Sequence, residues 1–406
     1  MIIAFGHLPP TPTIIAAVSS PSPLLVAQVG PYPPQPNGIG DYTSELCGAL
    51  RAADPKVSTL ALACRLPGTA EREPQVWRCW DPRSDWSAEL LRAVDAAQPH
   101  VVHLQHGLYM GHGRRVAGFL KGLRSRRIPS VVTLHGVWPT AVSRLWPRRF
   151  HLTLAGSADR LVIHQRAGSL NILLGHGVPV DRIEIIPHGT REASTVDPVL
   201  ARDKLGVARR PTVLFAGFIF RRKGLHTVVR AFESVSREVP EACLLAVGRE
   251  RSDHLLDRFY RLQLHRLTRR GRKAGWLDYR SGYVSEADLT LYYASADVVV
   301  FPYLRFYGSA SGTLHRALAA GRPAVCSNIP TFAEAVEAWG KDMPELIVPP
   351  GDVGSWSRAL TQVLSRDDLK ARAAEASAKL GRKSLWSSVA DEHIRMYRAL
   401  IAPGAR

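Results

Sequence analysis

The sequence predicts an α/β protein built from two Rossmann-like domains with parallel sheets. Short apolar runs alternate with helix-length segments from Leu24 to the end of the chain, a pattern typical of βαβ units. A polar and irregular segment, 191–211, interrupts this alternation before a new apolar run opens at Thr212. With 406 residues, the chain divides there into two domains of roughly 180 residues each.

The strands are expected at the apolar runs, which are too short for helices and are bounded by turn residues. In the first half these runs are Leu24–Val29, Val57–Leu62, Val101–Leu104, Val131–Leu134, Arg160–Ile163 and Ile183–Ile186. In the second half they are Thr212–Ala216, Ala242–Val247, Val298–Phe301, Ala324–Cys326 and Leu346–Val348. Parallel sheets bind ligands at the carboxyl ends of their strands, here in the cleft between the domains, so functional residues are expected directly after strands.

Composition limits the classes of function. No run of about 18 uncharged apolar residues is present, so no membrane-spanning helix is expected. Residues 1–23 are apolar and rich in proline but lack the basic start of a secretion signal, so we expect a loose extension or a start codon placed too early. The five cysteines lack CxxC spacing, which favours a reducing compartment over a zinc or disulfide framework.

The net charge of +18 suits nucleic acid, an anionic membrane surface or phosphate-bearing ligands. Basic residues cluster at 114–127, 144–149 and 258–273, and the first two clusters lie among Trp138, Trp146 and Phe150. Basic and aromatic side chains together suit a lipid headgroup region, although a solvated basic face is the commoner origin of any one cluster. No nucleic-acid-binding pattern such as an RRM or a zinc finger is present, so nucleic acid is not expected as a partner.

The most informative segment is Val298–Val325. It predicts a buried strand, a loop of small residues and a short helix that Gly321 and Pro323 end. Unpaired N–H groups and the positive end of the helix dipole attract phosphate to such a loop. The N–H groups concerned are those of Ser311, Gly312, Thr313 and Leu314. The alternative is an ordinary connection between a strand and a helix.

A second loop follows the first predicted strand and contains Asn37, Gly38, Ile39, Gly40 and Asp41. Glycines at this place let the backbone approach a phosphate at the start of a helix. The third glycine of the dinucleotide fingerprint is missing, so binding of NAD or FAD is not supported. The alternative is a simple turn in which Asp41 caps the helix.

A third loop places Arg221, Arg222 and Lys223 just before a helix. Cations at a helix N-terminus oppose its dipole, which costs stability unless an anion is bound. Arginine grips phosphate with two N–H groups and lysine acts as a point charge. An anion site is therefore favoured over a solvated surface turn.

His135 follows the strand at 131–134 and precedes Gly136, so its side chain is expected to point into the cleft rather than into the core. His103 and His106 follow the preceding strand and are expected to line the same cleft. Their spacing is not a recognised ligand set and no acidic partner is near, so no metal site is expected.

In their order and spacing, these motifs resemble the GT-B glycosyltransferases of the large retaining family 4. The resemblance covers about Leu24 to Tyr397. It rests on Gly-Ile-Gly (38–40), TLHG (133–136), IIPHG (185–189), AGF and RRKG (216–224), ADVVVFPY (296–303), SGTLHRALAAGRPAV (311–325) and VPPGD (348–352). It implies an acceptor domain at 24–195, a nucleotide-sugar donor domain at 206–380 and a last helix at 381–406 that crosses back onto the first domain.

The resemblance also implies the reaction, which is transfer of a hexose from a nucleotide diphosphate-sugar with retention at the anomeric carbon. Lys223, together with Arg222 or Arg221, would neutralise the diphosphate leaving group with help from the amides of Ser311–Leu314. The chain contains no Asp-x-Asp sequence, which fits an enzyme that needs neither a metal ion nor a cofactor, since fixed cations replace the divalent ion.

On the same resemblance, His135 would contact the donor sugar or the acceptor, and Gly38 and Gly40 would let the acceptor side close over the phosphates. The family's two glutamates correspond here to Gly308 and Arg316, and its phosphate-strand arginine corresponds to Phe218. We keep Arg316 among the nucleotide-binding candidates, although it cannot accept a ribose hydrogen bond as a carboxylate does.

Two classes of function remain open. The first is a cytoplasmic enzyme that makes cell-envelope polysaccharide, glycolipid or a related glycoside, acts on a glycan, lipid-linked or small-molecule acceptor and contacts the anionic inner face of the membrane. The second is a GT-B-shaped protein that has lost catalysis and serves as a binding or scaffold subunit. The missing glutamates favour the second class, whereas His135 and Lys223 favour the first.

Overall fold

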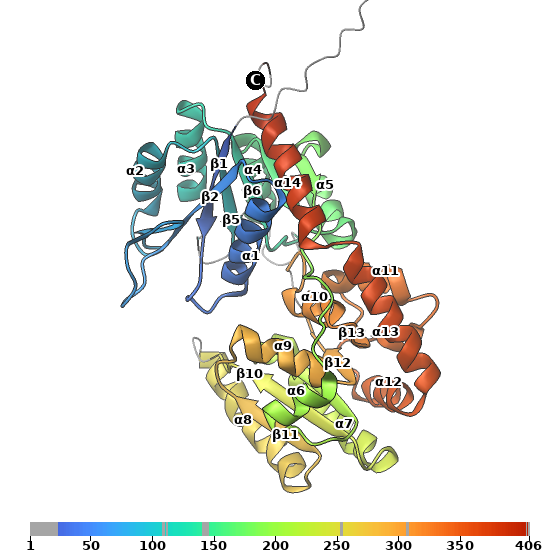
Figure 1. Ribbon diagram of the computed structural model, residues 1–406. Helices are drawn as coiled ribbons and strands as arrows, with labels where there is room; N and C mark the ends of the chain where they lie inside the picture. Colours follow the sequence, from blue (N-terminus) through green and yellow to red (C-terminus); the bar gives the residue numbers. More distant parts are fainter. Residues whose placement is uncertain are drawn as a thin grey trace, which may run out of the picture.

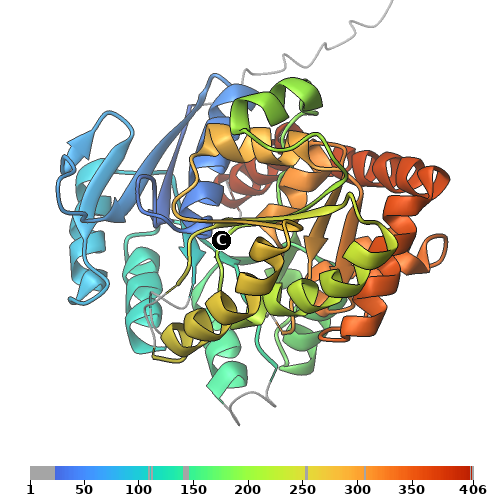
Figure 2. The ribbon, with the colours of Figure 1, turned by 90° about the horizontal axis from the view of Figure 1, so that it is seen from below.

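The computed structural model describes residues 23–107, 110, 113–139, 146–251, 255–305, 308–402 and 404. The expected N-terminal extension lies outside the described residues, apart from Pro23. The described chain forms two α/β domains, each built on its own sheet (Figure 1). The sheets are flanked by helices, as the view from below also shows (Figure 2).

The N-terminal domain contains an eight-stranded sheet with the order β3-β4-β2-β1-β5-β6-β7-β8. Its strands are β1 (Leu24–Gly30), β2 (Val57–Cys64), β3 (Arg72–Glu73), β4 (Val76–Trp80), β5 (Val101–His106), β6 (Ser130–Leu134), β7 (Arg160–Ile163) and β8 (Ile183–Ile185). Neighbouring strands pair in parallel except for β3 and β4. The strand order reverses between β1 and β5, which makes this the topological switch point of the sheet.

The C-terminal domain contains a six-stranded sheet with the order β11-β10-β9-β12-β13-β14. Its strands are β9 (Thr212–Ala216), β10 (Cys243–Gly248), β11 (Leu277–Ser281), β12 (Val298–Phe301), β13 (Ala324–Ser327) and β14 (Ile347–Val348). All of its pairs are parallel, and the order is that of a Rossmann sheet with its switch point between β9 and β12.

Helices connect the strands of both sheets. In the N-terminal half they are α1 (Gly38–Ala53), α2 (Trp86–Ala97), α3 (Arg114–Ser125), α4 (Trp146–Ser157) and α5 (Asn171–Gly175). They continue as α6 (Pro198–Leu205), α7 (Leu225–Glu238), α8 (Leu255–Lys273), α9 (Glu286–Ser295) and α10 (Gly312–Ala319). The last are α11 (Ala333–Trp339), α12 (Val353–Ser365), α13 (Asp367–Arg382) and α14 (Trp386–Ile401).

Every predicted strand is present, with its ends shifted by a few residues at most. Strands β3, β4 and β11 were not predicted. Two of them, β3 and β11, are edge strands, and both carry polar, partly exposed side chains rather than an apolar run, because an edge strand is not buried from both sides. Strand β4, VWRCW, alternates buried and half-buried positions and has no continuous apolar run.

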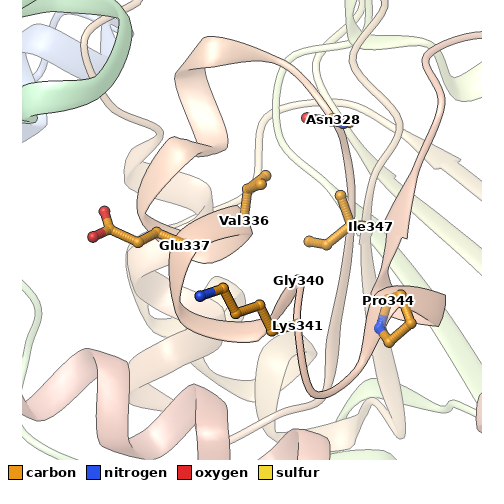
Figure 3. A pocket seen from close by; sticks show the side chains of 7 residues that line it. All are labelled: Asn328, Val336, Glu337, Gly340, Lys341, Pro344 and Ile347. Atoms are coloured by element: carbon orange, nitrogen blue, oxygen red, sulfur yellow. The ribbon is translucent and has the colours of Figure 1, made fainter.

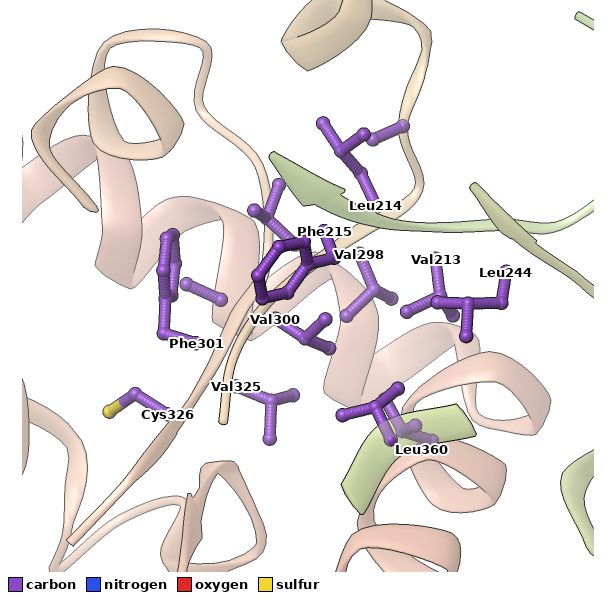
Figure 4. Packing of buried hydrophobic residues seen from close by; sticks show 14 of the residues in the cluster. Val213, Leu214, Phe215, Leu244, Val298, Val300, Phe301, Val325, Cys326 and Leu360 are labelled. Atoms are coloured by element: carbon purple, nitrogen blue, oxygen red, sulfur yellow. The ribbon is translucent and has the colours of Figure 1, made fainter. Parts of the chain in front are cut away.

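The core of the C-terminal domain explains why its central strands could be recognised. Val213, Phe215 and Val298 belong to one cluster of buried side chains between the strands and α12 (Figure 4). Buried side chains of this size each contribute about 1.5–3 kcal/mol to folding. A strand buried on both faces must therefore be apolar at successive positions, and this is the pattern that the sequence displays.

The last helix, α14, packs against the N-terminal domain. Trp386 and Tyr397 of α14 are buried in a cluster with Leu46 of α1, and Figure 1 shows α14 running alongside α1. A Cβ atom at Gly189 would lie 2.0 Å from the Trp386 ring, so only glycine fits there. The helix α1 begins at Gly38 and is capped by Asn37, whose side chain accepts from the N–H of Ile39 at 2.9 Å; the alternative cap by Asp41 is wrong.

Candidate functional site

Segments that follow strands of both sheets meet between the domains. The N–H of Ser309, after β12, donates to the carbonyl of His135, after β6, at 3.0 Å. Gly136 and Gly308 form an antiparallel bridge beside this bond, and the side chain of Gln165 donates to the carbonyl of Ser309 at 2.6 Å. Two of the predicted site segments are therefore joined directly by main-chain contacts across the domain boundary.

Lys223 lies against the loop that follows β12. Its Nζ atom is 3.7 Å from the centre of the Tyr303 ring, a cation–π contact. The Tyr303 hydroxyl forms hydrogen bonds with Thr313 at 2.8 Å and with Ser311 at 3.2 Å. Burial opposes ionisation of Tyr303, but the ammonium of Lys223 and these hydroxyls outweigh it and lower the pKa of the phenol. Tyr303 thus fixes the cation beside the start of α10.

Two glycines allow this close approach. Gly224 has φ +72°, and a Cβ atom there would lie 1.7 Å from the carbonyl oxygen of Pro302. Gly217 has φ +122°, and a Cβ atom there would lie 3.2 Å from Thr313. Both positions favour glycine on conformational grounds, and together they bring the loop after β9 against the start of α10.

The start of α10 presents free backbone donors. Ser311 is the N-cap residue, but its side chain makes no capping bond; it bonds Tyr303 and Thr313 instead. The amides of Gly312 and Thr313 have no acceptor among the described residues, as expected for the first residues of a helix. Arg221 and Arg222 are exposed, and neither forms an ion pair within the described chain. This end of the site is therefore positively charged and rich in donors.

His135 ends a directed chain of buried hydrogen bonds. Its Nε2 atom lies 2.9 Å from Oε1 of Gln105. The Gln105 amide donates to Oε1 of Gln28 at 2.9 Å, and the Gln28 amide donates to the hydroxyl of Tyr397 at 3.3 Å. Tyr397 lies 2.5 Å from Nδ1 of His103, whose Nε2 atom lies 2.7 Å from the hydroxyl of Thr133.

These bonds assign the tautomers. Because the Gln105 amide nitrogen donates to Gln28, its oxygen must accept from His135, so His135 carries its proton on Nε2. The Nδ1 atom of His135 then keeps its lone pair and has no hydrogen-bond partner among the described residues. Burial, reinforced by His164 and His188, holds the pKa of His135 well below its usual value, so the ring is neutral and can accept a hydrogen bond.

Arg316 lies in an ionic cluster that joins the two domains. Its guanidinium pairs with Glu286 of α9 and approaches Glu45 of α1 at 3.7 Å. Arg191, in the segment between the domains, pairs with Glu45 at 2.6 Å and with Glu286 at 3.1 Å. The second oxygen of Glu45 accepts from the Trp386 indole at 2.8 Å. The guanidinium of Arg316 thus draws two carboxylates to its position.

Asp41, in the first turn of α1, faces the same cluster. Burial raises the pKa of this carboxyl to about 6; Arg316 and Arg191 oppose the shift, and Glu286 and Glu45 add to it. Gly38 is exposed, and a Cβ atom there would meet no atom within 4 Å. A Cβ atom at Gly40 would lie 3.4 Å from the backbone of Pro31, so Gly40 serves packing within the loop.

The prediction that His103 and His106 line the cleft is wrong, and so is the placement of His106 after a strand. Both lie inside β5 and are fully buried. His106 packs against Phe150, with ring centres 4.9 Å apart. Within the described part of the chain, no group of three or more histidine, cysteine or acidic side chains could hold a metal ion.

An open hollow of about 640 Å³ lies elsewhere, against α11 and β14. Figure 3 shows its lining, which includes Glu337, Lys341 and the apolar side chains of Val336 and Ile347. None of the predicted site residues lines it, and its one carboxylate and one ammonium offer no convergent donor set, so we do not assign the chemistry to this hollow.

The basic clusters lie on separate helices. Residues 114–127 form α3 and the turn after it, and residues 258–273 lie on α8; Arg144 lies outside the described residues. The aromatic rings expected at the surface are not there, because Trp138 and Phe150 are buried and Trp146 packs beside each of them with ring centres 6.0 Å apart. None of the described helices is long and apolar enough to cross a membrane.

Sequence reasoning missed several residues that shape this region. Tyr303 stands at the end of a recognised motif, two residues after β12, so its position was a usable signal. Gln105 lies two residues after His103 in β5, so both side chains are on the same face of the strand. Polar residues at such buried positions indicate a hydrogen-bonded network. Glu45, Arg191 and Glu286 carry no sequence signal, because only the fold brings them together.

Two family models match the chain. The model described as Glycosyltransferase Family 4 matches residues 36–193, and the model described as Glycosyl transferases group 1 matches residues 210–366. The two matches together span most of both domains.

Curated relatives include an O-antigen chain mannosyltransferase B from Escherichia coli, 27% identical over 233 residues that cover 55% of this chain and 56% of that protein. A phosphatidyl-myo-inositol mannosyltransferase from Mycobacterium leprae is 30% identical over 232 residues, which cover 56% of each chain. The chain thus spans about half the length of the curated relatives it matches.

Solved structures share the fold over nearly the whole chain. A sucrose-phosphate synthase from Thermosynechococcus elongatus superposes with a TM-score of 0.72 at 19% identity and covers 93% of this chain and 99% of its own. The Anabaena protein HepE in complex with UDP superposes with a TM-score of 0.70 at 14% identity and covers 93% of this chain and 100% of its own. At such identities the likeness concerns the fold alone.

Proposed function

The chain belongs to the family 4 type of GT-B glycosyltransferases, and from this premise we propose that it transfers a hexose from a nucleotide diphosphate-sugar to a glycan, lipid-linked or small-molecule acceptor. The proposed transfer proceeds with retention at the anomeric carbon and without a metal ion or a cofactor. Because two relatives are named mannosyltransferases, GDP-mannose is the first donor to test.

The observation that carries this proposal is the position of Lys223 beside the start of α10. Its ammonium lies over Tyr303, and Tyr303 bonds the two hydroxyls at the N-terminus of that helix. A diphosphate placed there would meet a fixed cation and the amides of Gly312 and Thr313. Preorganised charges of this kind stabilise negative charge that develops on a leaving group.

Each step of the proposed reaction uses groups of this chain. As the bond between the anomeric carbon and the diphosphate breaks, the acceptor oxygen bonds to that carbon and its proton passes to the leaving phosphate. The charge that gathers on the phosphate oxygens is neutralised by Lys223 with Arg221 or Arg222, in place of a divalent ion. His135, neutral and protonated on Nε2, accepts a sugar hydroxyl hydrogen bond at Nδ1. Gly38 leaves room for the acceptor side to approach.

Nucleotide binding in this proposal involves Glu286 rather than a glutamate on α10. Arg316 occupies the position of the family's second glutamate, and it holds Glu286 by an ion pair. The Glu286 side chain is 44% exposed, so its carboxylate has room to accept from ribose hydroxyls as a carboxylate does. Arg316 then contributes to nucleotide binding indirectly, by orienting Glu286.

We place the enzyme in the cytoplasm, in the synthesis of cell-envelope polysaccharide or glycolipid, with peripheral contact to an anionic membrane and no nucleic-acid partner. The test is a thermal-shift screen with UDP-, GDP- and ADP-sugars, followed by transfer and hydrolysis assays with and without EDTA. We expect a raised Tm with one nucleotide class and activity that EDTA leaves unchanged. If no nucleotide shifts the Tm, the alternative of a scaffold subunit without catalysis replaces this proposal.

A further inference from the structure

Helix α8 carries apolar side chains on its outward face. Four of the nine large apolar side chains that the described residues expose belong to it, namely Leu255, Leu256, Phe259 and Leu262, which are 57–79% exposed. Surface helices normally turn their apolar face to the core and keep the other face polar. The outward face of α8 therefore differs from that of an ordinary solvated helix.

The inner face of α8 packs against the core of the C-terminal domain. Tyr260 and Leu264 are buried, and a Cβ atom at Gly271 would lie 2.5 Å from the Trp276 ring. These residues follow helical spacing on one side of α8. Leu255, Phe259 and Leu262 follow the spacing i, i+4, i+7 on the opposite side, so the helix has two separate apolar stripes.

The outer stripe is surrounded by positive charge. Helix α8 contains seven basic residues and one acidic residue. Arg266, Arg269, Arg272 and Lys273 are exposed and form no ion pair within the described chain. Figures 1 and 2 both place α8 on the outer surface of its domain, on the same side of the molecule as the basic helix α3.

We propose that the outer face of α8 is a docking surface for an anionic lipid bilayer, an inference that rests on the peripheral membrane contact in the proposed function and names the surface that makes it. An apolar stripe set among basic residues is the pattern of a helix that lies in the plane of a membrane interface, with its apolar side chains in the acyl boundary and its cations at the headgroups. Leu255, Phe259 and Leu262 insert, and the basic side chains contact anionic lipid.

Other occupants fit this face less well. A second copy of the chain would bring the same basic helix against itself, and like charges oppose that pairing. The phosphates of a nucleic acid would contact the cations. They would leave the three exposed apolar side chains Leu255, Phe259 and Leu262 without an apolar partner. An anionic bilayer matches both the charge and the apolar stripe.

The experiment is co-sedimentation of the full chain with vesicles of phosphatidylcholine alone or mixed with phosphatidylglycerol. We expect binding to the anionic vesicles and not to the neutral ones. The double variant Phe259→Ser/Leu262→Ser should weaken the vesicle partition coefficient about tenfold. The matched control is Val199→Ser/Leu200→Ser on α6, whose side chains are 48% and 51% exposed, and it should bind as the wild type does.

A second measurement keeps the result interpretable. Hydrogen exchange of α8 should slow on anionic vesicles in the wild type and not in the double variant, while far-UV circular dichroism shows that both are folded. The proposal fails if the wild type does not bind anionic vesicles, or if the double variant binds them equally well. It also fails if the same variant abolishes a dimer in solution, or if the chain binds oligonucleotides through α8 in preference to vesicles. None of these readouts depends on glycosyl transfer.

Discussion

The Nε2 atom of His135 lies 2.9 Å from the Oε1 atom of Gln105, and this bond decides which face of the imidazole is available for chemistry. Gln105 cannot turn its amide around, because its nitrogen donates to Gln28. Nδ1 is therefore left as the accepting atom of a ring whose pKa burial keeps low. A side chain on β5 of the N-terminal sheet, in the other domain from the candidate phosphate site, thus fixes the proton of His135.

Gln105→Met removes the acceptor while keeping a similar volume. We expect turnover to fall about tenfold with little change in donor KM, because His135 loses its fixed tautomer and orientation.

Gln105→Glu keeps an acceptor but adds a charge, which raises the pKa of His135, so its activity should be lost more steeply below neutral pH than that of the wild type. Gln362→Met, on the exposed side of α12, is the control. Equal pH profiles for wild type and Gln105→Glu would contradict the role of Gln105.

Lys223→Ala tests the proposed phosphate site. We expect turnover to fall about a hundredfold, because a preorganised cation on the leaving group is lost, while the free energy of unfolding changes by no more than about 1 kcal/mol, the size of one cation–π contact. Steady-state kinetics and urea unfolding measure the two effects. Lys204→Ala, at an exposed position on α6, should change neither. A wild-type rate in Lys223→Ala would remove this residue from the site.

The raised pKa of Asp41 predicts that the stability of the protein depends on pH. Its pKa is about 6 in the folded protein against 3.8 for the unperturbed group, so between these values the folded state binds the proton more tightly. Stability from this group is therefore greatest at low pH and is lost as the pH rises through 6. Asp41→Asn should raise the free energy of unfolding at pH 8 by about 2 kcal/mol more than at pH 4.5. Urea unfolding at the two pH values measures the difference, and an equal effect at both would show that Asp41 is not perturbed.

Arg316→Glu restores the residue that the family carries, yet we expect it to harm this protein. The new carboxylate would face Glu45 and Glu286 with only Arg191 left to pair with the three carboxylates, which should cost about 2 kcal/mol. The charge-swapped variant Arg316→Glu/Glu286→Arg should recover most of that loss. Thermal unfolding of the single and the swapped variants decides this, and a swap that is no more stable than the single variant would rule out the pairing.

Gly189→Ala tests how α14 is held. The added Cβ atom would lie 2.0 Å from the Trp386 ring, so the ring must move, and we expect a loss of about 2–3 kcal/mol. Gly156→Ala, where no atom lies within 4 Å of the new Cβ, should lose nothing. Chemical unfolding of both variants is the measurement. A stable Gly189→Ala protein would mean that α14 packs more loosely than its buried side chains indicate.

Local sequence patterns were sufficient to predict the buried strands and the loops that follow them. Strands such as Val298–Phe301 are buried on both faces, so their apolar runs stand out, and the loops after them could be recognised from glycine and cation spacing. The edge strand Leu277–Ser281 has mixed polarity and therefore gave no such signal. The strand expected at 101–104 continues to His106, which was placed after the strand because a polar residue in a buried strand looks like the end of that strand.

The arrangement of the site needed the fold. The contact of Lys223 with Tyr303 joins two loops that follow different strands. Neither loop has a sequence feature that indicates the other as its neighbour. The same holds for the cluster of Glu45, Glu286 and Arg316, whose members come from three helices in two domains. Charge pairing of this kind depends on how the domains are placed, and the sequence shows only that charged residues are present.

The contact between His103 and Tyr397 joins residues 294 positions apart, and it has a consequence for synthesis on the ribosome. The N-terminal sheet is translated first, but the hydroxyl that completes its buried hydrogen bonds arrives with the last helix. Gln28 and His103 therefore stay without this partner until the whole second domain has been made. The first domain to emerge is thus the last to be finished, and a chaperone that binds the nascent chain would have to cover the side chains that later pack against α14 for most of translation.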